Sequence, residues 1–385
     1  MKKQILFING HLNTGGVEKS LIDVLQHMDY DQYEVDLLLL EGMGDYAGEL
    51  PPQVRVKLRC LQNTYGSVGE ALKRCIREKD WFCFRMRLIF LMQKFFGQKM
   101  IRMAKNALTD GTHYDAAIGF RSGICTQIAV WATNADHRLT WWHHGAINVN
   151  YEEYVEQVRD CQAVAVVSDA CRRMLSDAVP EIASKLVVVP NMLDPSSVQA
   201  KAQAFIPYEH GKKIHLVSVG RLSPEKHFEN IIFAAKQLRS AGKQFCWHLV
   251  GDGPMKNSLL QVIQDEGLES YVILEGNQPN PYPYIKNADL FVHPSYVESQ
   301  GIVVMEAMAL GVPCVVTKSL GPCEFVEDGV NGILTEQSPE SLTEKVLEIL
   351  NQPELYQKIK QNTSCPEQFL PERVMEKIET LVDGR

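Results

Sequence analysis

Two glutamates and a glycine in the segment 293–311 have the types and spacing of a ligand site. The segment reads HPSYVESQGIVVMEAMALG, with seven residues between Glu298 and Glu306. Gly301 stands where a helix should begin, after an apolar strand that ends at His293. N–H groups at a helix start favour a bound phosphate, and carboxylates accept hydrogen bonds from sugar hydroxyls. The pattern suits a ligand with a central diphosphate and sugars at either end, whereas two glutamates without this context would be ordinary surface charges.

Two cations follow another apolar strand. Residues 218–226 read SVGRLSPEK, and Arg221 and Lys226 lie on the turn into the next helix. At about 4 Å and an effective dielectric constant near 20, each cation attracts a phosphate charge with roughly 4 kcal/mol of gross Coulomb energy. Such attraction would stabilise a departing diphosphate without a metal ion. Taken alone, the same two residues would be interpreted as a solvated turn.

The elements that must position these residues alternate between short apolar strands and helices. This alternation predicts an α/β fold with two parallel, doubly wound, Rossmann-like sheets, which bind ligands at the carboxyl ends of their strands. Residues 190–212, with three prolines, interrupt the rhythm and are interpreted as a linker, and residues 366–383 resemble a last amphipathic helix. The predicted strands are 4–9, 33–40, 115–120, 137–142, 162–167, 185–189, 214–219, 245–250, 271–275, 289–293, 313–317 and 331–334. The predicted helices include 17–28, 169–178, 227–239, 254–264, 301–310 and 338–350.

Length, charge and cysteine use limit the class of protein. A chain of 385 residues is expected to form two domains, and its net charge of −8 argues against a partner nucleic acid. The ten cysteines, Cys60 among them, form no C-x-x-C pair, so we expect free thiols in a reducing cytosol and no zinc site. The opening apolar run is too short for a signal peptide, and no run reaches a membrane span, so a cytoplasmic protein is expected.

Residues 73–105 depart from the acidic average of the chain. They contain ten Lys or Arg against two acids, a local charge of +8, together with six Trp or Phe. A basic, aromatic, helical stretch is typical of a helix that lies on an anionic membrane, where each basic residue contributes about 1 kcal/mol. The competing interpretation is a helix pair with its aromatic side chains in the core and its charges in solvent.

Motifs along nearly the whole chain resemble the retaining glycosyltransferases of family 4, which have the two-domain GT-B fold. The motifs in the second half are more specific than those in the first. The matching motifs are GGVE at 15–18, WWHH at 141–144, PN at 190–191, GRLSPEK at 220–226, GDGP at 251–254, the two glutamates at 298 and 306, LGVP at 310–313 and GPCEFVEDGVNG at 321–332. The resemblance implies an acceptor domain over 1–192, a nucleotide-sugar domain over 193–365, and a helix over 366–385 that packs back on the first domain.

The resemblance also implies a role for each matching residue. Glu306 would bind the nucleotide ribose, and Glu298 would contact the donor sugar near the reacting centre. Asn277 and Gln278 would border the base, and His143, or its neighbour His144, would contact a sugar. The full set is Glu298, Arg221, Lys226 and His143 for catalysis, and Gly15, Gly16, Gly220, Asn277, Gln278, Ser299, Gln300, Gly301, Ile302, Val303 and Glu306 for substrate and nucleotide. Gln300 departs from the aromatic residue that the family often has there, which makes the donor sugar harder to infer.

The function that the resemblance implies is the retaining transfer of a hexose or N-acetylhexosamine, without metal or cofactor, from a nucleotide sugar, expected to be UDP-linked. The basic segment adds the expectation of a lipid-linked glycan acceptor at the inner face of the plasma membrane, in surface polysaccharide synthesis. A GT-B-fold nucleotide-sugar epimerase or phosphorylase is the first alternative. A non-catalytic partner in glycan assembly is the second, although such a protein would have no need of Arg221, Lys226, Glu298 and Glu306 together.

Overall fold

The computed structural model describes the chain except residues 1, 60–67, 146–150, 210, 212 and 385, and it leaves out the side chains of residues 94, 106 and 151–153. Cys60, expected to be a free thiol, therefore lies outside the described residues. The chain forms two compact units. The first unit comprises Met1–His143, Ile147–Met192 and Pro371–Arg385, and the second comprises His144–Ala146 and Leu193–Leu370.

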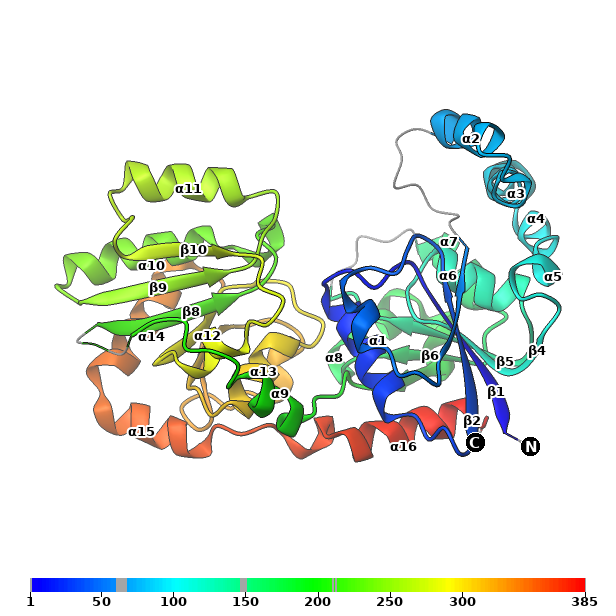
Figure 1. Ribbon diagram of the computed structural model, residues 1–385. Helices are drawn as coiled ribbons and strands as arrows, with labels where there is room; N and C mark the ends of the chain where they lie inside the picture. The colour runs from blue at the N-terminus through cyan, green and yellow to red at the C-terminus, as the bar shows by residue number, and fades with distance from the viewer. Residues whose placement is uncertain (1, 60–67, 146–150, 210, 212, 385) are drawn as a thin grey trace. The chain divides into compact units, whose positions relative to one another are not determined.

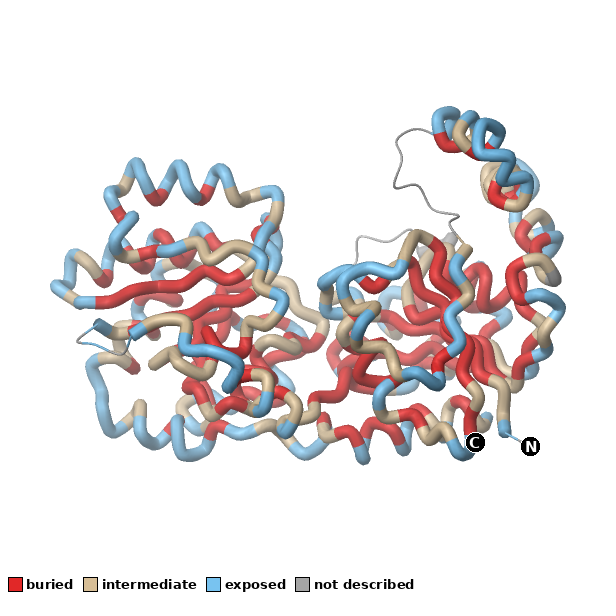
Figure 2. The backbone as a smooth tube through the Cα atoms, in the orientation of Figure 1, coloured by how far each residue is buried: buried red, intermediate tan, exposed pale blue. Residues whose placement is uncertain are grey.

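The first unit is built on a seven-stranded parallel sheet in the order β3-β2-β1-β4-β5-β6-β7 (Figure 1). Its inner strands are apolar runs because helices cover both faces of a parallel sheet. The burial colouring in Figure 2 shows these strands as the core of the unit. The strands are β1 (Lys3–Asn9), β2 (Tyr33–Leu39), β3 (Arg55–Leu58), β4 (His113–Gly119), β5 (Asn134–Trp142), β6 (Ala163–Val166) and β7 (Leu186–Val188).

The helices of the first unit pack apolar faces on this sheet. In the last helix, Val374, Ile378 and Val382 are buried at a spacing of four residues, so one face of α16 joins the core of the first unit. The unit contains η1 (Asp45–Glu49), η2 (Ile128–Ala132), η3 (Pro180–Lys185), α1 (Gly16–His27), α6 (Ile124–Gln127), α7 (Tyr151–Val158), α8 (Asp169–Ala178) and α16 (Pro371–Val382), with α2 to α5 described next.

The basic segment folds as four consecutive helices. These are α2 (Val68–Arg77), α3 (Trp81–Phe96), α4 (Gln98–Arg102) and α5 (Lys105–Leu108), and Figure 1 shows α2 and α3 projecting from the sheet of the first unit. Asp80 caps α3 by accepting a hydrogen bond from the N–H of Cys83 at 2.9 Å. Gly97 ends α3 at a φ of 64° and starts α4. The helical expectation for this segment is met, with breaks at residues 78–80, 97 and 103–104.

The second unit is built on a six-stranded parallel sheet in the order β10-β9-β8-β11-β12-β13 (Figure 1). The strands are β8 (Ile214–Val219), β9 (Phe245–Val250), β10 (Val272–Gly276), β11 (Leu290–His293), β12 (Cys314–Thr317) and β13 (Ile333–Thr335). The helices are α9 (Pro195–Lys201), α10 (Glu229–Ser240), α11 (Lys256–Asp265), α12 (Tyr282–Lys286), α13 (Ile302–Ala309), α14 (Pro339–Asn351) and α15 (Pro353–Asn362), with η4 (Pro224–Lys226), η5 (Pro322–Glu324) and η6 (Glu367–Phe369).

Three features of the fold differ from the sequence prediction. The segment 190–212 is not a linker throughout, because Asp194 caps α9 and the following Pro195 fits the first helical position. The edge strand β3 was not predicted, because Arg55 and Lys57 interrupt its apolar pattern and the strand lies at the exposed margin of the sheet. In addition, α12 and α15 form in stretches where no helix was predicted.

Candidate active site

The two ligand-binding loops predicted from the sequence lie side by side in the second unit. They follow β8 and β11, which are neighbours in the sheet, with Phe291 opposite Val217. Contacts between the loops hold them together: the rings of His227 and Tyr296 stack with centroids 3.7 Å apart, and the Ser295 hydroxyl donates to a backbone carbonyl of the other loop at 3.3 Å. The carboxyl ends of these strands therefore form one site.

The centre of the site is the carboxylate of Glu298. Its Oε1 accepts a short hydrogen bond from the ammonium of Lys226 and a second from Nε2 of His293 at 2.7 Å. The Glu298 side chain is 12% exposed, that of Lys226 22% and that of His293 3%. Both bonds go to one oxygen, and among the described residues Oε2 makes no such bond. A carboxylate oxygen without such a bond can accept one from a ligand.

The ionisation of Glu298 is fixed by these neighbours. Burial by itself raises the pKa of this carboxyl, but the charge of Lys226 and the hydrogen bond from His293 outweigh it and lower the pKa to about 2. Glu298 is therefore a carboxylate at neutral pH, an acceptor only, with a cation beside it.

Arg221 supplies a second cation at the same strand end. It follows Gly220 directly after β8 and is exposed, and its guanidinium makes no hydrogen bond or ion pair with any described residue. Gly251, at the end of the neighbouring strand β9, lies so close that a Cβ there would be 1.9 Å from the carbonyl oxygen of Gly220. Glycine at this point lets the two loops meet without a side chain between them.

The stretch Ser299–Gln300–Gly301 leads into α13, whose first residues are Ile302 and Val303. Gly301 has a φ of 85°, and a Cβ there would lie 2.9 Å from the ring of Pro322, so a side chain is excluded by both conformation and space. The first N–H groups of a helix have no intrahelical partner. An anion beside α13 could therefore be bound by main-chain donors, with the two cations on the neighbouring loop.

Glu306 lies one turn into α13 and is buried. The hydroxyl of Tyr282, in α12, donates to Glu306 Oε1 at 2.9 Å. Glu298 and Glu306 thus belong to the same strand–loop–helix segment but are held by different neighbouring side chains. In the loop after β10, Asn277 is exposed, and the amide of Gln278 folds back to donate to the carbonyl of Glu275 at 2.8 Å.

The remaining predicted residues belong to the first unit. Gly15 caps α1 and Gly16 is its first residue, in the loop after β1. His143 follows β5, and its ring packs 5.0 Å from that of Phe120. The next residue, His144, is exposed and is assigned to the second unit. Gly15, Gly16 and His143 each lie beyond the carboxyl end of a strand of the first unit.

Sequence reasoning missed two residues that hold the glutamates in place, His293 and Tyr282. For His293 a signal existed: it is the one polar residue of the strand Leu-Phe-Val-His and stands five positions before Glu298. Nothing in the sequence around Tyr282 indicated that its hydroxyl would reach Glu306, because that contact depends on how α12 packs on α13.

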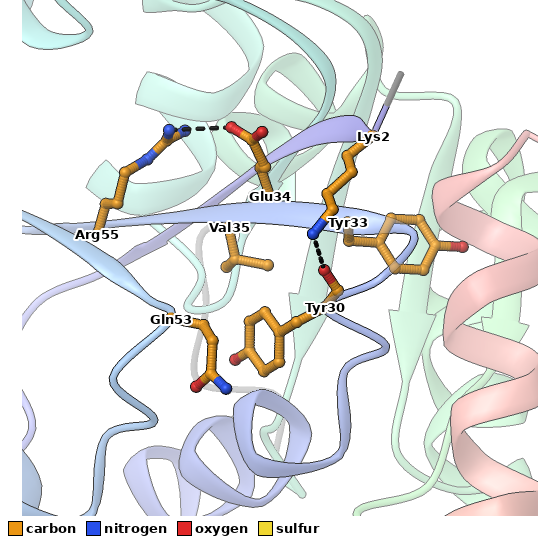
Figure 3. Close-up of a pocket in the computed structure, with 7 residues that line it drawn as sticks. All are labelled: Lys2, Tyr30, Tyr33, Glu34, Val35, Gln53 and Arg55. Carbon is orange, nitrogen blue, oxygen red and sulfur yellow. Dashed lines mark hydrogen bonds and ion pairs between the residues drawn. The ribbon is translucent and has the colours of Figure 1, made fainter.

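A pocket of about 280 Å³ in the first unit is separate from these loops. It is formed where β1, β2 and β3 begin, so it lies at the end of the sheet opposite to the predicted site residues (Figure 3). Its cations already have partners: Lys2 donates to the carbonyl of Tyr30, and Arg55 pairs with Glu34. We assign no function to this pocket.

Comparison with solved structures defines the class of the fold. Anabaena HepE, solved in complex with UDP and glucose, aligns over 100% of both chains with a TM-score of 0.74 and 21% identity. WaaG, a glycosyltransferase involved in lipopolysaccharide biosynthesis, aligns over 99% of this chain and 100% of its own with a TM-score of 0.70 and 15% identity. The predicted GT-B fold is thereby confirmed.

The sequence of the second unit matches a family model. Residues 200–364 match the model of the glycosyl transferases group 1, which supports the family resemblance seen in the motifs. N-acetyl-alpha-D-glucosaminyl L-malate synthase of Bacillus anthracis is 33% identical over 136 residues, which are 34% of this chain and 36% of that protein. The lipopolysaccharide core biosynthesis glycosyltransferase LpsE of Rhizobium meliloti is 34% identical over 121 residues, 31% of this chain and 34% of LpsE. The matches thus span about a third of each relative's length.

Proposed function

We propose that this protein is a retaining glycosyltransferase that moves a hexose or N-acetylhexosamine from a UDP-sugar to a glycan acceptor in surface polysaccharide synthesis. The observation that carries the proposal is the placement of Lys226 and His293 on one oxygen of Glu298, with the exposed Arg221 on the loop that also carries Lys226. A buried carboxylate with a cation next to it can accept a hydrogen bond from a sugar hydroxyl, while the cations stabilise the negative charge of the diphosphate. The HepE structure, solved with UDP and glucose, supports this class of donor, and the name of LpsE, a lipopolysaccharide core biosynthesis glycosyltransferase, supports this class of reaction.

The proposed reaction breaks the bond between the anomeric carbon and the diphosphate oxygen and forms a bond from that carbon to an acceptor hydroxyl on the same face. Arg221 and Lys226 stabilise the charge that develops on the leaving diphosphate, with the N–H groups at the start of α13. Glu298 orients the donor sugar through a hydroxyl, and Glu306 binds the ribose. The leaving phosphate takes the acceptor proton, so no side-chain base is required.

A panel of UDP-, GDP- and ADP-sugars, measured by thermal shift, tests the donor. A donor at 100 times its Kd stabilises the folded protein by about 2.7 kcal/mol. We expect stabilisation by a UDP-sugar in the unaltered protein and its loss in Glu306→Ala. Glu344→Ala, an exposed glutamate on α14, is the matched control and should keep the full shift. No shift with any nucleotide sugar would contradict the proposal.

Turnover assays distinguish glycosyl transfer from the alternative functions. Arg221→Ala should lower kcat more than it raises the donor KM, because its charge is needed most when the diphosphate departs. The control is Lys358→Ala, an exposed cation on α15. Formation of a new nucleotide sugar from donor alone would identify an epimerase, and release of a sugar phosphate on addition of inorganic phosphate would identify a phosphorylase. Donor binding with no turnover of any kind would indicate a non-catalytic partner.

We further propose that residues 73–105 dock the protein on an anionic membrane, at the inner face of the plasma membrane, where a lipid-linked acceptor is presented. Apolar side chains on these helices are exposed: Trp81 62%, Phe95 79%, Phe96 60% and Met103 59%. Exposed basic residues stand among them; they are Lys73, Arg77, Lys79, Arg85, Lys99 and Arg102. Among the described residues, no helix is long and apolar enough to cross a bilayer.

Cosedimentation with vesicles tests the docking. The variant Lys99→Glu with Arg102→Glu reverses two exposed charges and should release the protein from vesicles that contain anionic lipid. Lys358→Glu with Arg373→Glu makes the same change in net charge elsewhere on the surface and should leave binding intact. Phe95→Ser should weaken binding to the same vesicles without changing the charge. Equal cosedimentation of all these proteins would contradict the proposal.

A further inference from the structure

Three helices of the second unit meet beside Glu306. α9, α12 and α13 contact one another on one face of the six-stranded sheet (Figure 1). Apolar residues of all three helices, among them Val198, Ile285 and Met308, belong to one buried cluster. Tyr282 belongs to the same cluster, and both it and Glu306 are 5% exposed. The tyrosine hydroxyl and the carboxylate therefore meet in a place that solvent scarcely reaches.

Tyr282 holds the carboxylate of Glu306 by a direct hydrogen bond. Its Oη donates to Glu306 Oε1 at 2.9 Å. A glutamate side chain has several rotatable bonds, and it loses conformational freedom when a ligand fixes them. A hydrogen bond that orients the carboxylate before the ligand arrives removes this cost from binding. The contact is thus a means of making Glu306 ready for a ligand.

The backbone that carries Tyr282 is held in two ways. Pro281 and Pro283 flank it, and the ring of each proline fixes its φ. The amide of Asn280 joins this backbone to α9. Its Oδ1 accepts a hydrogen bond from the N–H of Tyr282 at 3.3 Å, and its Nδ2 donates to the carbonyl of Lys201 at 2.8 Å. Lys201 is the last residue of α9, so α9 fixes the point from which the tyrosine side chain leaves α12.

The same helix also holds the far end of α13. Gln199, in α9, donates from Nε2 to the carbonyl of Ala309, the last residue of α13, at 2.7 Å. Its Oε1 accepts a hydrogen bond from the ammonium of Lys286, the last residue of α12, at 3.3 Å. Both helices are therefore tied to one common element. The placement of Tyr282 against Glu306 is set by three packed helices rather than by a loop.

We propose that Tyr282 is a positioning residue for the nucleotide: its hydroxyl orients Glu306 to accept a hydrogen bond from a ribose hydroxyl, and Asn280 holds Tyr282 in place. That Glu306 meets the ribose rests on the proposed function. The geometry adds that ribose recognition depends on a hydroxyl from a different helix. A tyrosine that only packed would support the binding of every nucleotide equally, whereas a positioning residue acts through the ribose hydroxyl.

Isothermal titration calorimetry on the full chain tests this role with UDP, 2′-deoxy-UDP and 3′-deoxy-UDP. In the unaltered protein, loss of the ribose hydroxyl that Glu306 binds should weaken binding about tenfold. Tyr282→Phe should weaken the binding of UDP about fivefold and should leave the binding of that deoxynucleotide almost unchanged. The preference for the ribose hydroxyl then falls from about tenfold to about twofold. Asn280→Ala should lower the preference in the same direction.

Two further variants serve as controls. Glu306→Gln removes the carboxylate, so adding Tyr282→Phe to it should not lower the ribose preference further. Tyr356→Phe is the matched change elsewhere in the second unit. The Tyr356 hydroxyl donates to the carbonyl of Asp289 at 3.0 Å, just before β11 begins, at the opposite end of that strand from Glu298. Its loss should leave the affinities for all three nucleotides unchanged.

The outcomes separate the positioning role from the proposed function. If Tyr282→Phe weakens the binding of all three nucleotides equally, the tyrosine only packs, and the positioning role is overturned. An unchanged preference for the ribose hydroxyl in Tyr282→Phe would overturn it as well. In both cases the binding of UDP to the unaltered protein leaves the proposed function standing. If the unaltered protein does not bind UDP, the proposed function fails and the positioning role fails with it.

Discussion

Replacement of Lys226 by methionine should destabilise the second unit, because it leaves the buried carboxylate of Glu298 without its cation. The lowering of the Glu298 pKa from 4.5 to about 2 corresponds to roughly 3 kcal/mol at 1.36 kcal/mol per pKa unit. Removing one partner of a buried ion pair costs a similar amount, about 3–5 kcal/mol. Since 1 kcal/mol shifts the Tm of a unit of this size by about 2–4 °C, Lys226→Met should lower it by roughly 6–12 °C.

Scanning calorimetry of the full chain at pH 7 measures this change. Adding Glu298→Gln to Lys226→Met removes the unpaired charge and should recover most of the lost Tm. The sign of the pH dependence follows from a lowered pKa. The stabilisation is present above pH 4.5, and it is lost as the pH falls towards 2. The difference in Tm between the unaltered protein and Lys226→Met should therefore become smaller in acid. A Tm of Lys226→Met within 2 °C of the unaltered value at pH 7 would refute this reasoning.

Three further predictions concern the second unit. His293→Phe removes one hydrogen-bond donor to Glu298 and should lower kcat about tenfold with little change in the donor KM. His293→Gln keeps a donor and should recover part of the lost kcat. Steady-state kinetics measure both variants. Burial lowers the pKa of His248, but its hydrogen bonds, including that to Glu275, raise it to about 9. The free energy of unfolding that this pKa shift contributes is complete below pH 6.5 and is lost as the pH rises towards 9. In urea unfolding, the free energy of unfolding of His248→Asn should therefore fall less over this pH range than that of the unaltered protein. Gly301→Ala should lower the Tm, because alanine disfavours a φ of 85° and its Cβ meets a neighbouring ring; an unchanged melting curve would contradict this.

Much of the fold could be predicted from the sequence because its determinants are local. Buried parallel strands are apolar runs, and helices show their own spacing, so β1 and β8 were placed within a residue of their ends. The misses have physical reasons. β3 is an exposed edge strand with a mixed pattern. α9 was missed because the prolines of residues 190–212 were interpreted as helix breakers, although Pro195 starts the helix.

The candidate site, too, could be predicted only in part from the sequence. The residues at 220–226 and 298–306 could be found because short motifs encode loop shape, as the positive φ of Gly301 illustrates. The partners of those residues were missed, because each contact depends on how a loop folds back or how a helix packs. His293 reaches Glu298 across a loop, and Tyr282 reaches Glu306 from another helix.

By itself, the sequence determined that this protein has two βα-repeating halves, and which short motifs carry chemistry, since periodicity and turn residues act over a few positions. Only the tertiary structure decided which charges meet. The ion pair of Lys226 with Glu298 joins residues 72 positions apart, and that of Glu18 with Arg121 joins residues 103 apart. Such contacts depend on strand order and on the packing of loops at a sheet edge, which no local pattern specifies.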